Sequence, residues 1–296
     1  MKANILTHKP HAQPYWDARA AANFICGGTG TGLLLFAALD TARGGSFLVP
    51  GVVALAFIAL GLSMVFLEIG RPERAPFVIL RPGTSWMSRE ALTSMPLFGF
   101  GLLAILGSLP IGARFGIPVV PTAGVAALAG LVFLYCQSRM VSWGRGIPAW
   151  REPLSVPLMF TSGLSEGAGA MLIVTALVAE PALWVIAAAG VLVILRSLVW
   201  KRYLQRLHDG KVPEASIQAL DKISVFVTLG GAALPIFLLV IAAVTIQSRA
   251  PAAALAGLCA LGAGWLAKLV LITKAGVTQG FSLPVTPVRG GKFDAA

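Results

Sequence analysis

The chain of 296 residues is 57% apolar and only 12% charged, which excludes a soluble domain of ordinary composition. Its formal charge of +11 would suggest a nucleic-acid partner in a soluble protein, but basic residues of membrane proteins collect in cytoplasmic loops, so the excess is first a sign of topology. Eight membrane-spanning helices of about 20 residues would occupy roughly 160 positions. The remainder is short loops, so we expect any chemistry inside the helical bundle or on a partner.

Apolar runs bounded by glycine, proline and charged residues predict an all-α integral membrane protein, with eight transmembrane helices in a single membrane domain over residues 1–296. The predicted spans are 19–40, 51–69, 89–110, 121–141, 157–179, 182–200, 222–246 and 251–274. The expected arrangement is two four-helix bundles. No sequence repeat relates the two halves, which gives an inverted-repeat transporter no support. The segment before the first span lacks the features of a signal peptide, so we expect that span to be retained.

Lysine and arginine are distributed unevenly between the two ends of these spans. Twenty of the 23 basic residues lie at the end that carries both termini and the loops joining spans 2–3, 4–5 and 6–7, whereas the other end has Arg43, Arg114 and Arg249. The positive-inside rule then predicts a bacterial inner-membrane protein with both termini in the cytoplasm. A partner or a site is expected on that face, because its loops are longer and contain tryptophan, proline and acidic residues.

Residues that could bind a metal are few and poorly placed. The three cysteines occur singly in apolar segments, without the spacing of zinc or iron–sulfur sites. The histidines are His8, His11 and His208, in the amino-terminal tail or a polar loop, so no pair can hold a haem between helices. We therefore expect no haem, iron–sulfur cluster or other metal site in this chain.

A glycine-rich run over residues 27–32 superficially resembles a nucleotide-binding loop. It lies inside an apolar helix and follows no strand, which argues against that interpretation. Small residues four positions apart, such as Gly28 and Gly32, allow helices to approach closely in lipid. The same role is expected for Gly163 and Gly167 in the fifth span.

Acidic residues within the spans are more informative, because an ionisable group in the hydrocarbon region is costly and usually faces a partner or a wet cavity. Glu68 ends the second span, Glu90 opens the third and Glu166 lies within the fifth. For the first two, pairing with neighbouring arginines is as good an interpretation as a functional role. Glu166 is expected either to have a functional role or to form an interhelical ion pair with Lys268. If Lys268 does not form that pair, its long side chain is expected to extend the amine to the membrane interface.

Acids, amides and aromatic residues at membrane depth, near a partner-binding face and without a metal, are typical of a quinone site. Two-electron reduction of a quinone takes up two protons, so its oxygens need hydrogen-bond donors and a carboxylate route to water. The ring and its tail need an apolar, aromatic-lined cleft. Trp86 and Trp150 could close such a cleft, although tryptophan is common at membrane interfaces in any case. Electrons would come from a soluble subunit docked on the cytoplasmic loops.

Two loop motifs, taken with the eight spans, resemble a known family over essentially the whole chain. The first consists of Leu67-Glu68-Ile69-Gly70-Arg71-Pro72 and Thr84-Ser85-Trp86-Met87-Ser88-Arg89-Glu90, and the second of Ile147-Pro148-Ala149-Trp150 with Pro153, Pro157, Leu158 and Phe160. The first motif is similar to the connection between spans 2 and 3 in the NrfD-like superfamily. The second is similar to the Pro-x-Trp loop that leads into the fifth helix of that superfamily. The similarity is to its dimethyl sulfoxide reductase membrane-anchor (DmsC-type) branch.

The resemblance implies a subunit that exchanges electrons with the quinone pool, either menaquinone or ubiquinone. It also implies two partners, a ferredoxin-like subunit with four [4Fe-4S] clusters and a molybdenum or tungsten bis-pterin catalytic subunit. The carboxylate that the family links to quinol binding falls on Glu90. Dimethyl sulfoxide reductase members have a histidine where this chain has Glu68, which leaves the role of that position open. Lys268, Lys274 and the tail from Gln279 to Pro284 are similar to the anchors of phenylacetyl-CoA:acceptor oxidoreductases.

We therefore predict a quinone-interacting membrane anchor subunit of a molybdopterin/iron–sulfur oxidoreductase of anaerobic respiration, inactive on its own. The expected site residues are Glu90, Arg89, Trp86, Glu68, Glu166 and Trp150. The Glu90 carboxylate would contact the quinone and the neighbouring arginine would orient it. The tryptophans would close the cleft, and the other two glutamates would deliver protons.

Three alternatives remain open from the sequence. In a secondary transporter, Glu166 and Lys268 would serve ion coupling. A purely tethering anchor would hold a soluble oxidoreductase without contacting quinone. Finally, the same fold inserted the other way would place the partners in the periplasm.

Overall fold

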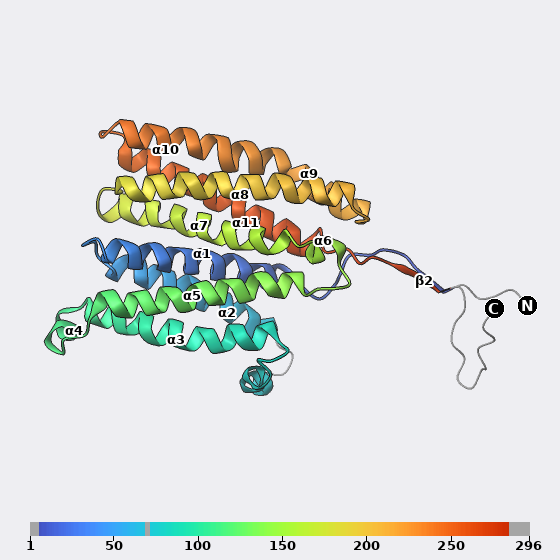
Figure 1. Cartoon of the computed structure of the whole chain (residues 1–296), viewed down its shortest axis with the longest axis horizontal. Helices are drawn as coiled ribbons and strands as arrows, with labels where there is room; N and C mark the ends of the chain where they lie inside the picture. The colour runs from blue at the N-terminus through green and yellow to red at the C-terminus, as the bar shows by residue number, and fades with distance from the viewer. Residues whose placement is uncertain (1–5, 69–71, 284–296) are drawn as a thin grey trace, which may run out of the picture.

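The computed structural model describes residues 6–68 and 72–283. In this part of the chain, eight long helices run side by side (Figure 1) and are long and apolar enough to cross a membrane. They are α1 (Ala18–Thr41), α2 (Leu48–Glu68), α3 (Trp86–Gly107), α5 (Val119–Ser142), α7 (Ser155–Val178), α8 (Leu183–Asp209), a compound helix over Glu214–Val244, and α11 (Arg249–Thr273). The predicted all-α membrane fold is confirmed.

Two helices extend well beyond the spans expected from hydropathy. The helix α8 continues from the predicted end at residue 200 to Asp209, and the compound helix begins at Glu214 instead of residue 222. Both extensions are polar, so an apolar run cannot reveal them. The predicted end of the second span at residue 69, and the motif residues Gly70 and Arg71, lie outside the described residues.

The compound helix consists of α9 (Glu214–Val225), a π-helical segment η2 (Phe226–Ala233) and α10 (Leu234–Val244). The π-helical turn coincides with a buried arginine of α8. Arg196 donates hydrogen bonds from its two terminal nitrogens to the carbonyl oxygens of Gly231 and Ala260, the second at 2.7 Å. A buried guanidinium is thereby satisfied by backbone oxygens, and the irregular turn supplies one of them.

The eight helices form two four-helix bundles, as the sequence predicted. The first contains α1, α2, α3 and α5, and the second contains α7, α8, α10 and α11. They meet along α1, which packs against both α7 and α11. Sixteen of the 24 residues of α1 are buried, so this helix is the centre of the molecule.

Glycine allows α1 and α7 to approach each other. A Cβ atom added at Gly167 would overlap the backbone of Gly32, and one added at Gly28 would lie 3.3 Å from the Cα of Gly163. The predicted packing role of these glycines is confirmed, since only the absence of a side chain permits this separation.

Short elements connect the spans, and the first and last described segments of the chain lie at one end of the bundle (Figure 1). We call this end the terminal face; it carries the 3-10 helix η1 (Pro72–Leu80), α6 (Pro148–Arg151) and the turn between α8 and α9. The helix α4 (Pro110–Arg114) lies at the opposite end. The strands β1 (Leu6–His8) and β2 (Phe281–Leu283) pair antiparallel and project beyond the terminal face, with Thr7 opposite Ser282. The sequence analysis did not predict these strands, because each is three residues long and its partner is at the other end of the chain.

Substituting Gly167→Ala should destabilise the chain, because the new methyl group meets the backbone of α1, which cannot rotate away. We expect the free energy of unfolding in mixed micelles to fall by about 1–3 kcal/mol, the usual effect of overpacking. Gly124→Ala is the matched control, since nothing lies within 4 Å of its added Cβ. Equal stability of the two variants would contradict the close contact.

Candidate functional site

A small pocket with mostly apolar walls and two glutamates opens at the terminal face of the first bundle, where α1 and α3 begin and α2 and α5 end. Its volume is about 40 Å³. Four lining residues come from the start of α1 and its approach, two from each of α2 and α3, and one from α5; they are Trp16, Ala20, Asn23, Phe24, Val65, Glu68, Met87, Glu90 and Met140. We call it the Glu90 pocket. Two of the six predicted site residues, Glu68 and Glu90, line it.

Local capping fixes the two helix starts that supply most of this pocket. The side chain of Asp17 caps α1 by accepting a hydrogen bond from the backbone N–H of Arg19 at 2.7 Å. Bonds from Arg19 lower the pKa of the Asp17 carboxyl below its usual value, so it is charged at the positive end of the helix dipole. Ser85 caps α3 by accepting from the N–H of Ser88, whose hydroxyl in turn donates to the carbonyl oxygen of Val78 in η1.

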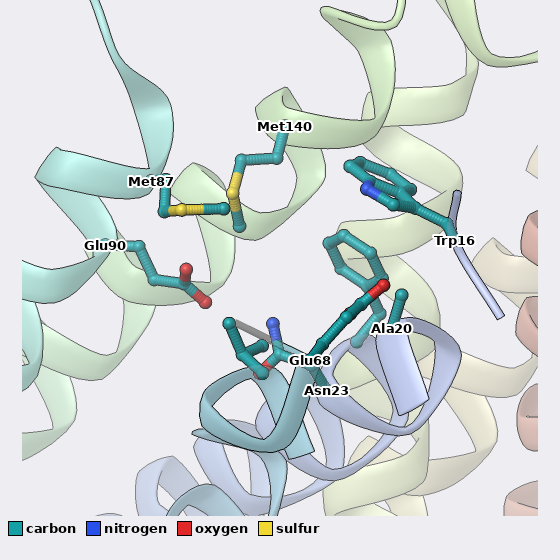
Figure 2. A pocket seen from close by; sticks show the side chains of 9 residues that line it. Trp16, Ala20, Asn23, Glu68, Met87, Glu90 and Met140 are labelled. Atoms are coloured by element: carbon teal, nitrogen blue, oxygen red, sulfur yellow. The ribbon is translucent and has the colours of Figure 1, made fainter. Parts of the chain in front are cut away.

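The Glu90 carboxyl group is one of two buried polar side chains that line the pocket, with that of Asn23. The residue is 4% exposed, and its Oε1 accepts a hydrogen bond of 3.0 Å from the Gln137 amide of α5. The same amide nitrogen lies 3.3 Å from the backbone oxygen of Asn23 and 3.4 Å from its side-chain oxygen. Figure 2 shows the Glu90 carboxylate and the Asn23 amide pointing into the same space from α3 and α1. In the described part of the chain, no cation forms an ion pair with Glu90.

A glycine makes room for this cluster. A Cβ added at Gly27 would overlap the amide of Gln137, so the side chain of α5 lies directly on the backbone of α1. Neither Gln137 nor Asn23 was identified from the sequence. The available signal was an amide within an apolar span, which in lipid needs a partner for each polar atom.

Glu68 and two methionines line the pocket around the Glu90 carboxyl group. Glu68 lies at the end of α2 and is half-buried, and Met87 is 42% exposed. In Figure 2 the thioether chains of Met87 and Met140 lie near each other above the Glu90 carboxylate. Methionine has three rotatable bonds and adapts its shape readily, so this side of the pocket can open without a change of backbone.

Arg89 and Trp86 do not lie where the sequence analysis expected. The Arg89 guanidinium donates to the carbonyl oxygens of Pro82 and Gly83, at 2.6 and 2.9 Å, and lies 4.1 Å from the Trp86 ring centroid. Neither residue lines the Glu90 pocket. Successive residues of a helix point in different directions, so Arg89 binds the preceding loop and does not orient the glutamate beside it.

Trp150 does not line the pocket. The residue is buried, and its indole N–H donates to the carbonyl oxygen of Leu271 at 2.8 Å. Its ring stacks on Trp16, with centroids 4.8 Å apart, and Trp16 is the tryptophan that lines the pocket. The sequence analysis did not assign Trp16, which precedes the first span.

Glu166 lies deeper, in a second buried cluster between the bundles. Its Oε2 is 2.7 Å from the Nζ of Lys268, and the Thr29 hydroxyl donates to the same oxygen at 2.8 Å. Lys268 is 2% exposed, so its amine does not extend to the membrane interface. Of the two expectations for this residue, the ion pair with Glu166 is the one that the structure contains. Space for the pair comes from α1 and α11, because a Cβ at Gly28 would overlap Nζ and one at Gly264 would overlap Oε1.

Successive carbonyl groups of α1 connect the two clusters. The Gln137 amide approaches the carbonyl oxygen of Asn23, and Lys268 donates to that of Phe24 at 3.2 Å. Toward the opposite face, α1 and α7 contribute Leu33, Phe36 and Met171 to one buried apolar cluster. The two polar clusters are therefore linked through α1 on the side of the terminal face. On the side of the opposite face, apolar side chains pack over them.

Within residues 6–68 and 72–283, no group of three or more histidine, cysteine or acidic side chains is arranged to hold a metal ion. The fold and the site together define an integral membrane protein of eight helices with a buried carboxyl and amide pocket at one membrane face. Residues 22–261 match the family described as DMSO reductase anchor subunit (DmsC). Because this match covers more than half of the chain, the chain belongs to that family, and the resemblance inferred from the loop motifs is confirmed.

A curated relative belongs to the sulfite dehydrogenase of Allochromatium vinosum, where it is the subunit designated C. It is 28% identical over 131 residues, which are 41% of this chain and 40% of that protein. The chain thus matches about two fifths of the length of this relative. The family description names an anchor subunit of a reductase, and the relative is named as a subunit of a dehydrogenase. Together with the eight apolar helices, they support a membrane anchor of an oxidoreductase complex.

Replacing Lys268→Met should leave the Glu166 carboxylate buried without its counter-ion. We expect the free energy of unfolding in mixed micelles to fall by about 3–5 kcal/mol, the usual cost of breaking a buried pair. The double variant Glu166→Gln/Lys268→Met removes both charges and should recover most of that loss. If the single and double variants were equally stable, the pair would not be charged in the folded protein.

Proposed function

We propose that this chain is the quinone-interacting membrane anchor of a multi-subunit molybdopterin/iron–sulfur oxidoreductase, and that the Glu90 pocket is its quinone site. The observation that carries the proposal is a buried carboxyl group that has no cationic partner among the described residues. It shares the cavity with the Asn23 amide and accepts a hydrogen bond from the Gln137 amide beside the cavity. The other walls are mainly methionine, phenylalanine, valine and tryptophan. A quinone supplies two carbonyl oxygens and a flat apolar ring, and this set of groups suits both.

The residues of the pocket have distinct proposed roles. Glu90 exchanges protons with the bound quinone, since it is the buried acid of the described chain with no charge to neutralise it. The amides of Asn23 and Gln137 orient that carboxyl group and can bind a carbonyl oxygen. Glu68, half-buried at the rim, passes protons between Glu90 and water.

Admission of a quinone ring requires the pocket to widen. A volume of about 40 Å³ accommodates a few water molecules. Met87 and Met140 are the side chains that can move aside, because both are unbranched and the first is substantially exposed. The isoprenoid tail would then extend between α2 and α3 into lipid, where both helices expose large apolar side chains such as Phe66 and Met95.

The proposed partners dock on the terminal face. They are a ferredoxin-like subunit with four [4Fe-4S] clusters, which would bring electrons near the Glu90 pocket, and a molybdenum or tungsten bis-pterin catalytic subunit. Support comes from the anchor family and from the position of the pocket on the same face as the paired termini. The basic residues on this face favour the cytoplasm, and the similarity to phenylacetyl-CoA:acceptor oxidoreductase anchors remains a prediction about the substrate of the complex.

The structure favours this proposal over a transporter. Glu166 and Lys268 bind each other, and the amine is also fixed on the carbonyl oxygen of Phe24. An apolar cluster lies between the pair and the opposite face, where ion coupling would need a second access route. An anchor that only tethers a soluble enzyme would not need a buried acid. Glu90 is such an acid, and it has no cationic partner among the described residues.

Substituting Glu90→Gln in the intact complex should lower quinone-linked turnover by at least about tenfold, because proton transfer by a positioned acid contributes factors of this order or more. Electron transfer from the partner enzyme to a soluble dye should be unchanged. The double variant Glu166→Gln/Lys268→Met is the matched control, because it removes the buried pair together and both residues lie outside the pocket. It should retain quinone-linked turnover. Full quinone activity of assembled Glu90→Gln complex would support the tethering alternative instead.

Fusion of a topology reporter after Ala296 should report a cytoplasmic carboxyl terminus, because lysine and arginine in the sequence are concentrated toward the end that carries the termini, whereas the opposite end has Arg43, Arg114 and Arg249. A second fusion in the loop that contains Arg114 should report the periplasm. The reverse pattern would show that the fold is inserted with its partners in the periplasm.

A further inference from the structure

A second cavity on the terminal face has a different character from the Glu90 pocket. It lies where α5 ends and α7 begins, at the seam between the two bundles, and has a volume of about 560 Å³. Its lining combines three arginines with a tryptophan, a serine and apolar or proline side chains: Arg139, Ser142, Trp143, Arg145, Arg151, Pro153, Val156 and Pro157.

The three arginines of this cavity have no acidic partner in the described part of the chain. The ion pairs found there involve other arginines and lysines, and Glu152, the nearest acid in sequence, pairs with Arg206 of α8. Arg151 binds the backbone oxygen of Arg145 and the amide oxygen of Gln279, each at 3.4 Å. The Nε atom of Arg139 is buried without a hydrogen-bond partner among the described residues. Three uncompensated guanidinium groups around one cavity repel each other, and an anion there would relieve that cost.

Aromatic packing holds two of these groups in place. The Arg145 guanidinium lies 4.5 Å from the ring centroid of Trp143, and that of Arg139 lies 5.1 Å from the ring centroid of Trp86. A planar guanidinium stacked on a ring keeps its edge available for hydrogen bonds to anionic oxygens. The arginines are therefore partly ordered before any ligand binds.

An apolar stripe leads from this cavity into the membrane. Leu128, Val132 and Tyr135 are 65%, 50% and 43% exposed. With Arg139 they follow helical spacing along α5, so they lie on one face of that helix. The cavity is at the end of the stripe, with Trp143 at the depth where tryptophan marks the membrane interface.

We propose that this cavity binds the phosphate group of an anionic phospholipid, with the acyl chains along the exposed stripe of α5. Arg145 and Arg151 attract the headgroup, and Arg139 donates to a phosphate oxygen at the base of the site. A lipid suits the cavity better than an acidic protein segment, because the charged groups lie at the end of an apolar helix face that is itself in the membrane. The bound lipid would connect α5 of the first bundle with α7 of the second.

Native mass spectrometry of the full chain, stripped of lipid in mild detergent, tests this assignment. Phosphatidylglycerol and phosphatidylcholine with the same acyl chains are added in parallel. We expect retention of one phosphatidylglycerol per chain with a preference of about tenfold or more, given about 1 kcal/mol for each basic residue near an anionic headgroup. The variant Arg145→Gln/Arg151→Gln should lose that preference. Lys201→Gln/Arg202→Gln, which removes the same charge from exposed positions of α8, should keep it within about twofold.

Three results would overturn the assignment. Equal loss in both double variants would show that only net charge matters. Displacement of the lipid by millimolar inorganic phosphate would assign the cavity to a free anion. If Arg145→Gln/Arg151→Gln retained lipid as before but lost the soluble subunits from the purified complex, the cavity would be a protein-docking surface. Arg139→Lys provides a milder variant, which keeps the charge but not the planar donor group and should weaken retention without altering the fold.

Discussion

Close backbone contact between α1 and α7 is the constraint on which the rest of this structure depends. Gly32 and Gly167 allow the two helices to touch, and this contact brings the bundles together around α1. Most of α1 is buried, so polar groups next to it find hydrogen-bond partners mainly on its backbone and on neighbouring helices, because lipid and apolar side chains offer none. The glycines next to the polar clusters solve this problem by leaving space for the side chains of neighbouring helices.

Both polar clusters are therefore organised by the same helix. Gln137 lies on α1 at Gly27 and Lys268 lies on it at Gly28, so each fills the space of a missing side chain. Their functions differ because their charges differ. The deeper cluster is an acid neutralised by a lysine, which suits a structural connection between bundles. In the shallower cluster the described neighbours of the acid are amides near the terminal face, which leaves it available for proton exchange with a ligand.

Hydropathy and charge were sufficient to predict the eight spans and the two bundles, since each span must be apolar over about 20 residues. Glu90 was predicted as a site residue from its position at the start of an apolar span together with the family resemblance. Gln137 and Asn23 could not be predicted, since nothing in a single sequence shows that residues more than a hundred positions apart face each other. Arg89 was expected to contact Glu90 because the two residues are adjacent in sequence. In the helix its side chain instead points toward the carbonyl oxygens of Pro82 and Gly83. Trp150 was expected at the cleft, but stacking placed Trp16 between it and the pocket.

The central claim, that the Glu90 pocket holds the quinone, is tested most directly by photolabelling the intact complex with an azidoquinone and mapping the modified residues by mass spectrometry. We expect labelling of the segment from Trp16 to Phe24, and of Met87 or Met140, with protection by excess unlabelled quinone. Protectable labelling confined to helices of the second bundle, in a complex that turns over with quinone, would contradict it.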